Sequence, residues 1–443
     1  MERNELGVIR ITPTHMDTVK EILLLIFIGA LIIAGVAVPA VSYVAFAFCA
    51  VLIFLMKADQ GFCLLFFLAP FATVFKFSVS SASCLTYLQL LLVVMTIIHR
   101  AQHTDKKMFA VLLVYILYVV FGSNLNVTLA IKQIMIPLTI YCFFYTNPDG
   151  NIKAFNCFVL GLLLSSIVSL FMDAIPNMEK YIILDKTIEL RDDVERMSGL
   201  YSDPNYYTIA LMVAISGLLS RFAARRVGYW ALIISLALIL FGIGTVSKSF
   251  LAVLAIVYVY FLICLYSQKR YRLATVFTAV GVGFVAAILF GRVAIFNNIL
   301  ARFEAGGGNA DSLMTNRNVI WEIYLDSIFS NNLLRTILGH GIGAGYPKGS
   351  VAAHNTALDF LYYYGFVGTG VFLVVCSAAA GKAEKRRTTA INMFSWVVLI
   401  VLMMMLSCLQ AFDFAFLIIM AVMNFRMDQN GTSALSHQES ARR

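Results

Sequence analysis

Two histidines in the C-terminal third of the chain lie on either side of a polar, glycine-rich stretch. His340 belongs to Gly339–Gly345, and His354 stands beside Asn355 immediately before a long apolar segment. Imidazole titrates near neutral pH, so such a side chain can take up a proton from a reacting hydroxyl or bind an anion. A polar and conformationally permissive stretch in a hydrophobic chain therefore predicts a site of chemistry.

Positive side chains and predicted helix N-termini favour an anionic ligand at the same site. Arg196, Lys248 and Arg317 each lie at the border of an apolar run, and predicted helices begin near residues 202–205, 245–248 and 354–355. A helix N-terminus presents unpaired N–H groups and a partial positive charge. Three of them on one surface, together with the three cations, predict a basic pocket suited to a phosphate.

The composition indicates that this site belongs to a polytopic membrane protein. The chain has 443 residues, 60% hydrophobic and 13% charged, with a mean hydropathy of +0.85. Average soluble proteins carry roughly 25% charged residues. The net charge of +9 is therefore interpreted as a signal of membrane topology, and no nucleic-acid partner is expected. The eight cysteines lie in or beside apolar runs, which predicts small core residues without a disulfide framework or a zinc site.

The apolar runs predict an all-α fold, a transmembrane helical bundle of about 14 helices (12–14). The first two are separated only by Pro39, and several runs have about 17 residues, near the minimum for a span. The predicted helices are 21–38, 40–56, 61–77, 84–98, 108–122, 128–146, 154–173, 204–220, 228–245, 248–267, 273–290, 354–378, 391–408 and 411–426.

Short basic loops predict the orientation of these helices. Lys and Arg cluster in residues 100–107, 221–226, 269–272 and 382–387, and helix counting places all four clusters on one side with both termini. Because cytoplasmic loops are rich in Lys and Arg, we expect both the N-terminus and the C-terminus inside. Of the six histidines, only His340 and His354 are then outside.

Two long polar segments fall on the opposite, extracytoplasmic face. The longer one, 291–353, contains two predicted amphipathic helices near 292–303 and 318–329, and such a loop is a common place for function. The predicted organisation is helices in 1–173, a first outer loop in 174–203, helices in 204–290, the large outer loop in 291–353, helices in 354–426 and a cytoplasmic tail in 427–443.

Each candidate residue also has a purely structural interpretation. Asp203 before Pro204 is typical of an ordinary helix start, and Lys248 at a helix end can extend its charge to the membrane interface. Gly339–Gly345 lacks the lysine and serine of a phosphate loop and suits a flexible connector. The functional interpretation rests on the expectation that all these residues lie on one face.

An ordered set of motifs resembles the superfamily of O-antigen polymerases and O-antigen ligases. The set covers roughly residues 196–370, and the earlier helices agree with the family only in character. It consists of Arg196 to Asn205, Ser247-Lys248, Asn316 to Trp321, Gly339 to Gly345, and His354-Asn355 through Gly365 and Gly368.

The resemblance implies a glycosyltransferase of lipopolysaccharide biosynthesis. Such enzymes build bacterial surface polysaccharide from undecaprenyl-pyrophosphate-linked oligosaccharides at the outer, periplasmic face of the inner membrane. The family's functional arginines fall on Arg196 and Arg317, and its essential histidine falls on His354. The family commonly has Ser-Arg where this chain has Ser247-Lys248, which keeps the charge and loses the bidentate fork.

The expected mechanism needs no metal ion and no cofactor. An acceptor hydroxyl attacks the anomeric carbon, undecaprenyl pyrophosphate leaves, and the arginines neutralise its charge. His354, Arg317 and Arg196 are the expected catalytic residues; whether His354 is the general base or binds a phosphate oxygen stays open. The expected partners besides the donor are membrane lipids and a chain-length regulator. Residues expected to bind the substrate or its pyrophosphate are Arg196, Lys248, Arg317, Asn205, Asn355, Tyr201 and His340.

Three functions remain as alternatives, in order. A polymerase transfers the glycan to another lipid-linked repeat unit, and the sequences Ala352 to Asp359 and Ser202 to Asn205 favour it. A ligase transfers the glycan to lipid A-core. A transporter or flippase of lipid-linked sugars is disfavoured, because its crossing path requires charged residues in the middle of helices, and here the charges gather at one surface.

Overall fold

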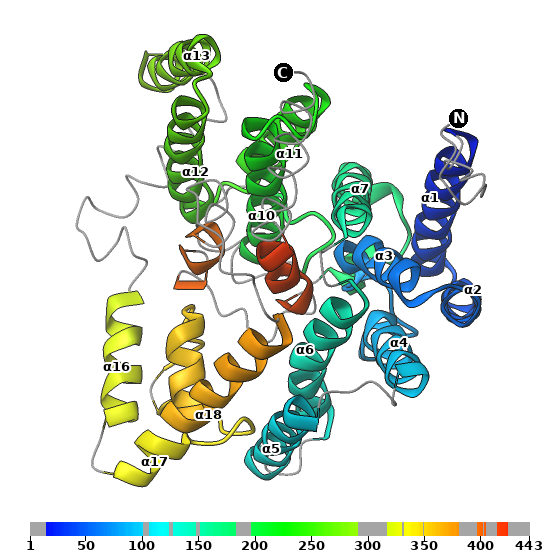
Figure 1. Ribbon diagram of the computed structural model, residues 1–443, viewed down its shortest axis with the longest axis vertical. Helices are drawn as coiled ribbons and strands as arrows, with labels where there is room; N and C mark the ends of the chain where they lie inside the picture. The colour runs from blue at the N-terminus through cyan, green and yellow to red at the C-terminus, as the bar shows by residue number, and fades with distance from the viewer. Residues whose placement is uncertain are drawn as a thin grey trace, which may run out of the picture.

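The computed structural model of the chain is helical throughout its described part (Figure 1). Within the described residues, Lys76 and Ser83 form an isolated β-bridge and no strand is present. The structure describes residues 15–100, 106–123, 127–147, 151–182, 196–290, 317–329, 332–348, 350–380, 397–401, 403–404 and 414–423. The prediction of an all-α fold is confirmed.

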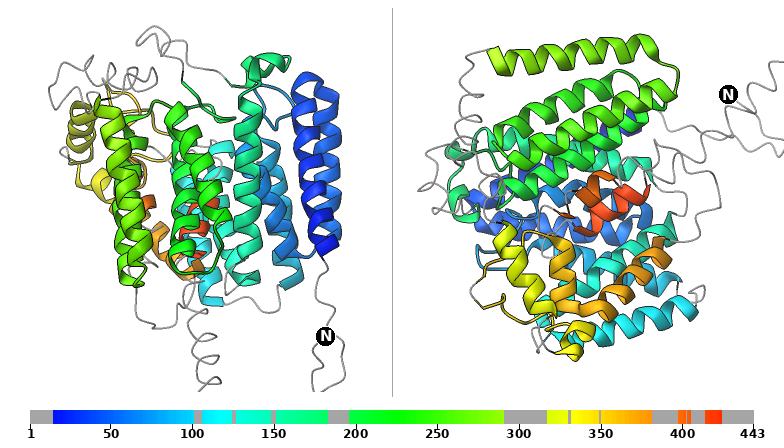
Figure 2. Two further views of the ribbon diagram at one scale, coloured as in Figure 1. Left: turned by 90° about the horizontal axis from the view of Figure 1, so that it is seen from above. Right: turned by 90° about the vertical axis from the view of Figure 1, so that its left-hand side faces the viewer.

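Seven helices form the N-terminal group. They are α1 (His15–Ala37), α2 (Pro39–Leu55), α3 (Ala58–Leu68), α4 (Cys84–Arg100), α5 (Lys106–Gly122), α6 (Val127–Thr146) and α7 (Ile152–Ser169). The short elements η3 (Met172–Ala174) and α8 (Met178–Tyr181) follow. In the left view of Figure 2, the long helices stand side by side with nearly parallel axes.

The central group contains the most deeply buried helix of the molecule. It comprises α10 (Pro204–Ala223), α11 (Trp230–Gly244), α12 (Lys248–Ser267) and α13 (Tyr271–Phe290). Every residue of α10 from Tyr207 to Ala223 is buried, and the helix lies near the middle of the view in Figure 1. A helix that is apolar on all sides is buried in this way because it has no polar face to present to solvent.

The C-terminal group comprises α16 (Arg317–Phe329), α17 (Leu333–Leu338) and α18 (Thr356–Ala380). Helical residues at 397–401, 403–404 and 414–423 fall inside the predicted helices 391–408 and 411–426. The predicted amphipathic helix at 318–329 is α16, whereas the one at 292–303 lies outside the described residues.

Six helices of the described part are long and apolar enough to cross a membrane. This supports a membrane protein, and the total of about 14 spans with both termini inside stays a prediction. The six candidate spans are Val19–Ala37, Leu129–Thr146, Ile152–Ser169, Pro204–Ala223, Lys248–Ser267 and Thr356–Ser377.

One predicted helix ends earlier than expected. The run 61–77 was expected to be continuous, but α3 ends at Leu68 and a single turn of 3-10 helix, η1 (Ala69–Phe71), follows. Pro70 lies in the first turn of η1, where its missing N–H and fixed φ are tolerated, but the same ring would clash inside a longer helix.

Candidate functional site

The start of α10 is fixed by its own cap. Asp203 has extended backbone angles, and its carboxylate accepts a hydrogen bond from the Asn205 N–H at 2.6 Å. Pro204 at the first helical position needs no partner for an N–H. The carboxylate of Asp203 is therefore held at the N-terminus of the central helix.

The turn between α11 and α12 lies beside this start. The Arg196 Nε donates to the Thr245 carbonyl at 3.0 Å, and the Ser247 hydroxyl donates to the Asn205 side-chain oxygen at 3.3 Å. Ser247 also caps α12 by accepting from the Phe250 N–H. Lys248, half-buried, is the first residue of α12. The N-termini of α10 and α12 thus lie together with Arg196 and Lys248.

Tyr201 and Tyr207 form an aromatic support beneath this segment. Their ring centroids are 5.7 Å apart, and both side chains are buried. The Tyr207 hydroxyl lies 2.5 Å from the Ser166 hydroxyl near the end of α7. The structure therefore places Tyr201, a predicted binding residue, in packing that holds the segment from Arg196 to Asp203 against α10.

α16 brings Arg317 to His354. The Trp321 indole N–H donates to the Ala353 carbonyl at 2.9 Å, and the Tyr324 hydroxyl donates to the Val351 carbonyl at 3.2 Å. Trp321 is one helical turn after Arg317, and Ala353 immediately precedes His354. These two bonds fix the backbone before the histidine against the helix that begins with the arginine.

His354, Arg317 and Asp203 form one electrostatic group. Burial is the main cause that lowers the pKa of His354, the Arg317 guanidinium lowers it further, and the Asp203 carboxylate opposes them. Burial likewise lowers the pKa of Arg317, and Asp203 again opposes it. The His354 imidazole is therefore neutral at pH 7, next to a guanidinium that remains charged. We refer to these three residues as the charged cluster.

His354 has a strained backbone, with φ at +49° in the left-handed region. For a residue with a Cβ, this conformation costs roughly 1–2 kcal/mol. The next residue explains how the chain holds it. Asn355 is 2% exposed and caps α18, because its side-chain oxygen accepts from the N–H groups of Ala357 at 3.0 Å and Leu358 at 3.2 Å. This gives Asn355, a predicted binding residue, a capping role.

The glycine-rich residues Gly339–Gly345, here called the glycine loop, repair a break in α18. Gly365 interrupts that helix with φ at +62°, so the carbonyls of the turn before it lose their partners within the helix. The His340 N–H donates to the Tyr362 carbonyl at 2.8 Å, and the Gly341 N–H donates to the Tyr363 carbonyl at 3.0 Å. A Cβ on Gly365 would collide with the Gly339 backbone.

The His340 side chain joins this repair. Its ring stacks on the Tyr362 ring with centroids 4.3 Å apart and an interplanar angle of 16°, and Nδ1 lies 3.2 Å from the Tyr362 carbonyl oxygen. Burial lowers the pKa of His340, the Tyr362 carbonyl opposes this, and Arg335 adds a smaller decrease. The structure therefore gives the predicted binding residue His340 an aromatic partner on α18, and the charged cluster forms without it.

Three residues of the site escaped the sequence analysis. Asp203 was interpreted only as a helix cap, and Trp321 and Tyr324 only as parts of an amphipathic helix. The two aromatic residues do carry a signal, because a buried indole N–H or phenol hydroxyl needs an acceptor. Which carbonyls accept from them depends on the tertiary fold.

Within the described ranges, no group of three or more His, Cys, Asp and Glu side chains has the arrangement of a metal site. What the charged cluster offers is a neutral imidazole, a guanidinium and a carboxylate at adjoining helix N-termini. That set can accept a proton from a hydroxyl and stabilise a phosphate. No protein-family model, no curated protein and no solved structure matches the chain.

Proposed function

We propose that this chain is a glycosyltransferase of the O-antigen polymerase type in the bacterial inner membrane. It transfers a glycan from undecaprenyl pyrophosphate to a hydroxyl of another lipid-linked repeat unit on the periplasmic side. The observation that carries the proposal is the convergence of His354, Arg317 and Asp203 from three segments far apart in the sequence. The ordered motifs that resemble the family contain all three residues.

The charges of the site suit the departure of pyrophosphate. As the glycosidic bond breaks, negative charge accumulates on the leaving phosphate oxygen. Arg317 can meet this charge with a bidentate contact, and Arg196 and Lys248 add positive charge at the N-termini of α10 and α12. In this proposal the protein's own cations stabilise the leaving group, and the mechanism requires no metal ion.

His354 is the proposed general base. Burial and Arg317 keep its imidazole neutral, so it can accept the proton of the acceptor hydroxyl as that oxygen attacks the anomeric carbon. The imidazolium that forms is stabilised by the neighbouring Asp203 carboxylate. One direct displacement inverts the configuration at the anomeric carbon.

Reconstitution with a defined substrate tests the proposal. The purified chain in vesicles, supplied with an undecaprenyl-pyrophosphate-linked repeat unit and a chelator, should form a ladder of lipid-linked products. Transfer only to added lipid A-core would identify a ligase instead. Scrambling of the lipid across the vesicle membrane without a covalent product would reject both transferases and favour a flippase.

A further inference from the structure

Two cysteines lie close together at the end of the helices opposite the charged cluster. Ser166, near the end of α7, lies beside Tyr207 in the first turn of α10, so the beginning of α7 points away from the site. Cys157 is in that beginning, and Cys63 is in the neighbouring helix α3. Both side chains are partly exposed.

The register of α3 and α7 aligns the two thiols. Cys63 is the sixth residue of α3, and Cys157 is the sixth residue of α7. Four residues further along each helix, Gly161 lies so close to Phe67 that a Cβ on the glycine would collide with the Phe67 carbonyl. The helices therefore approach to backbone contact one turn from the cysteines. A disulfide requires such an approach, with Cα atoms about 4.4–6.8 Å apart.

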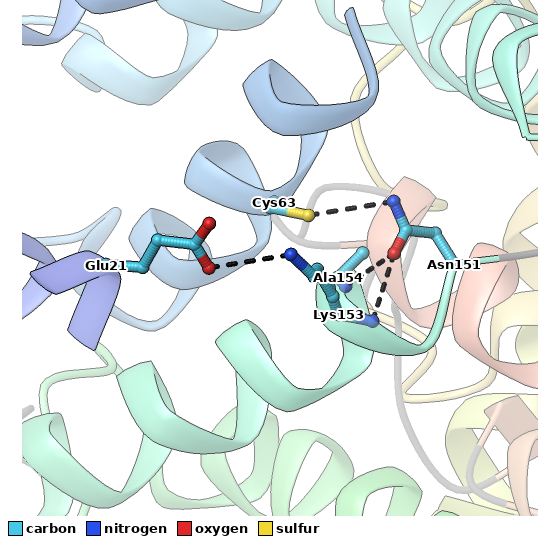
Figure 3. A network of polar contacts seen from close by, with 5 residues as sticks. All are labelled: Glu21, Cys63, Asn151, Lys153 and Ala154. Carbon is cyan, nitrogen blue, oxygen red and sulfur yellow. Dashed lines mark hydrogen bonds and ion pairs between the residues drawn. The ribbon is translucent and has the colours of Figure 1, made fainter. Parts of the chain in front are cut away.

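The thiols lie within hydrogen-bonding reach of each other, and Cys63 has a further polar partner. The Asn151 side-chain N–H donates to the Cys63 sulfur at 3.7 Å (Figure 3). The direction of this amide is set by the cap of α7, because its oxygen accepts from the N–H groups of Lys153 at 3.0 Å and Ala154 at 3.3 Å. The amide nitrogen is thereby left to face the sulfur.

The charges around Cys63 favour its thiolate over that of Cys157 as the attacking group. The Lys153 ammonium acts favourably on Cys63, and the amide N–H of Asn151 stabilises negative charge on the same sulfur. Lys153 also contacts the Glu21 carboxylate of α1 at 3.6 Å (Figure 3). The arrangement provides one activated thiol with a second thiol beside it.

We propose that Cys63 and Cys157 form an oxidisable dithiol, a modification site at which a small disulfide converts two thiols into one disulfide between α3 and α7. The Cys63 thiolate attacks one sulfur of the reagent and releases the other as a thiolate. The Cys157 thiolate then attacks the Cys63 sulfur and expels the second reagent thiol. The protein loses two electrons and two protons, and the reagent disulfide is reduced to two thiols.

Oxidation of the full-length chain in membranes by dipyridyl disulfide tests this inference. At limiting reagent, two pyridinethiones should be released per chain modified, and non-reduced digestion followed by mass spectrometry should identify a peptide pair linked through Cys63 and Cys157. Cys157→Ser should stop the reaction at a mixed disulfide on Cys63. Cys142→Ser, which changes a buried thiol on α6, should leave the linked peptide unchanged.

The role of Asn151 has its own variant. Asn151→Asp keeps an oxygen that caps α7 but replaces the N–H donor with a negative charge, so we expect the first release to slow by about three- to tenfold. The proposal is overturned if wild-type Cys63 accumulates the mixed disulfide without forming the linked peptide. It is equally overturned if Cys157→Ser releases the same two pyridinethiones as wild type.

Discussion

The glycine loop and the short segment Val351–Asn355 precede the same helix, and each carries one histidine. In the glycine loop, backbone N–H groups bond to the carbonyls of α18, and the His340 ring stacks on Tyr362. In Val351–Asn355, two backbone carbonyls accept from Trp321 and Tyr324 of α16, and the His354 ring adjoins Arg317 and Asp203.

The difference shows what prepares a histidine for chemistry. Residue type and glycine-rich context are the same for both histidines, so neither decides the outcome. What decides it is which groups the surrounding fold directs at the ring. Around His340 these are an aromatic face and a carbonyl, whereas around His354 they are opposite charges at adjoining helix N-termini.

The largest expected effect separates the two histidines. His354→Ala should reduce the turnover of polymerisation by roughly 10²–10⁴-fold, because the variant lacks the general base. His340→Ala should stay within a few-fold of wild type, since its loss removes a stacking contact on α18. Initial rates with the reconstituted lipid-linked donor measure both. Equal losses in the two variants would remove the distinction between the regions.

The second expected effect concerns the two arginines beside these histidines. Arg317→Lys should lower turnover by on the order of 10²-fold, because an ammonium cannot form the bidentate phosphate contact. Arg335→Lys, an exposed position in α17, is the matched control and should retain nearly full turnover. Turnover is measured at saturating donor. Wild-type turnover in Arg317→Lys would exclude bidentate contact as its role.

A smaller effect, on stability, tests the repair of α18. Gly365→Ala places a Cβ against the Gly339 backbone at a left-handed φ and should lower the free energy of unfolding by about 1–3 kcal/mol. Gly370→Ala lies in the same helix with open space around it, so it should be neutral or stabilising by up to about 1 kcal/mol. Thermal unfolding in one detergent compares them. Equal melting temperatures would contradict the repair.

The smallest expected effect is a shift in the pH profile. Because the pKa of His354 is lowered, the fall of kcat/KM on the acidic side should lie below the ordinary value of about 6.5. Asp203 opposes that lowering, so Asp203→Asn, which keeps a capping side chain, should move the acidic limb to still lower pH.

The same profile decides between the two roles of His354. A general base is active when neutral, so activity is lost as the pH falls through its pKa. An imidazolium that binds phosphate is active when charged, so activity would instead be lost as the pH rises through that value. An alkaline limb that moves with Asp203→Asn would therefore overturn the role of general base.

Local chemistry made much of the fold predictable. Apolar runs identified the long helices, and the prediction that α10 begins with an Asp203 cap and Pro204 is confirmed. Where Pro70 lies inside an apolar run, hydropathy alone extended α3 too far. Hydropathy reports how apolar a stretch is and contains no term for a missing backbone donor.

The partners of the site residues were less predictable. The cationic character of Arg317 and the placement of His354 before a helix were visible in the sequence, and their association with Asp203 depends on long-range packing. The function of the glycine loop was unreadable, because it depends on Gly365 breaking α18 and on carbonyls that only the tertiary fold exposes. Backbone accounting requires both partners.

The break in α18 also bears on how the protein is assembled during biosynthesis. The Tyr118 hydroxyl of α5 bonds to the carbonyls of Leu338 and Tyr364, and the Tyr364 hydroxyl donates to Gln133 of α6 at 2.7 Å. Lipid cannot satisfy those carbonyls, so a helix made late in translation depends on helices made early. Two fragments divided between α13 and α16 should therefore recombine when co-expressed, with α18 degraded if α5 and α6 are missing.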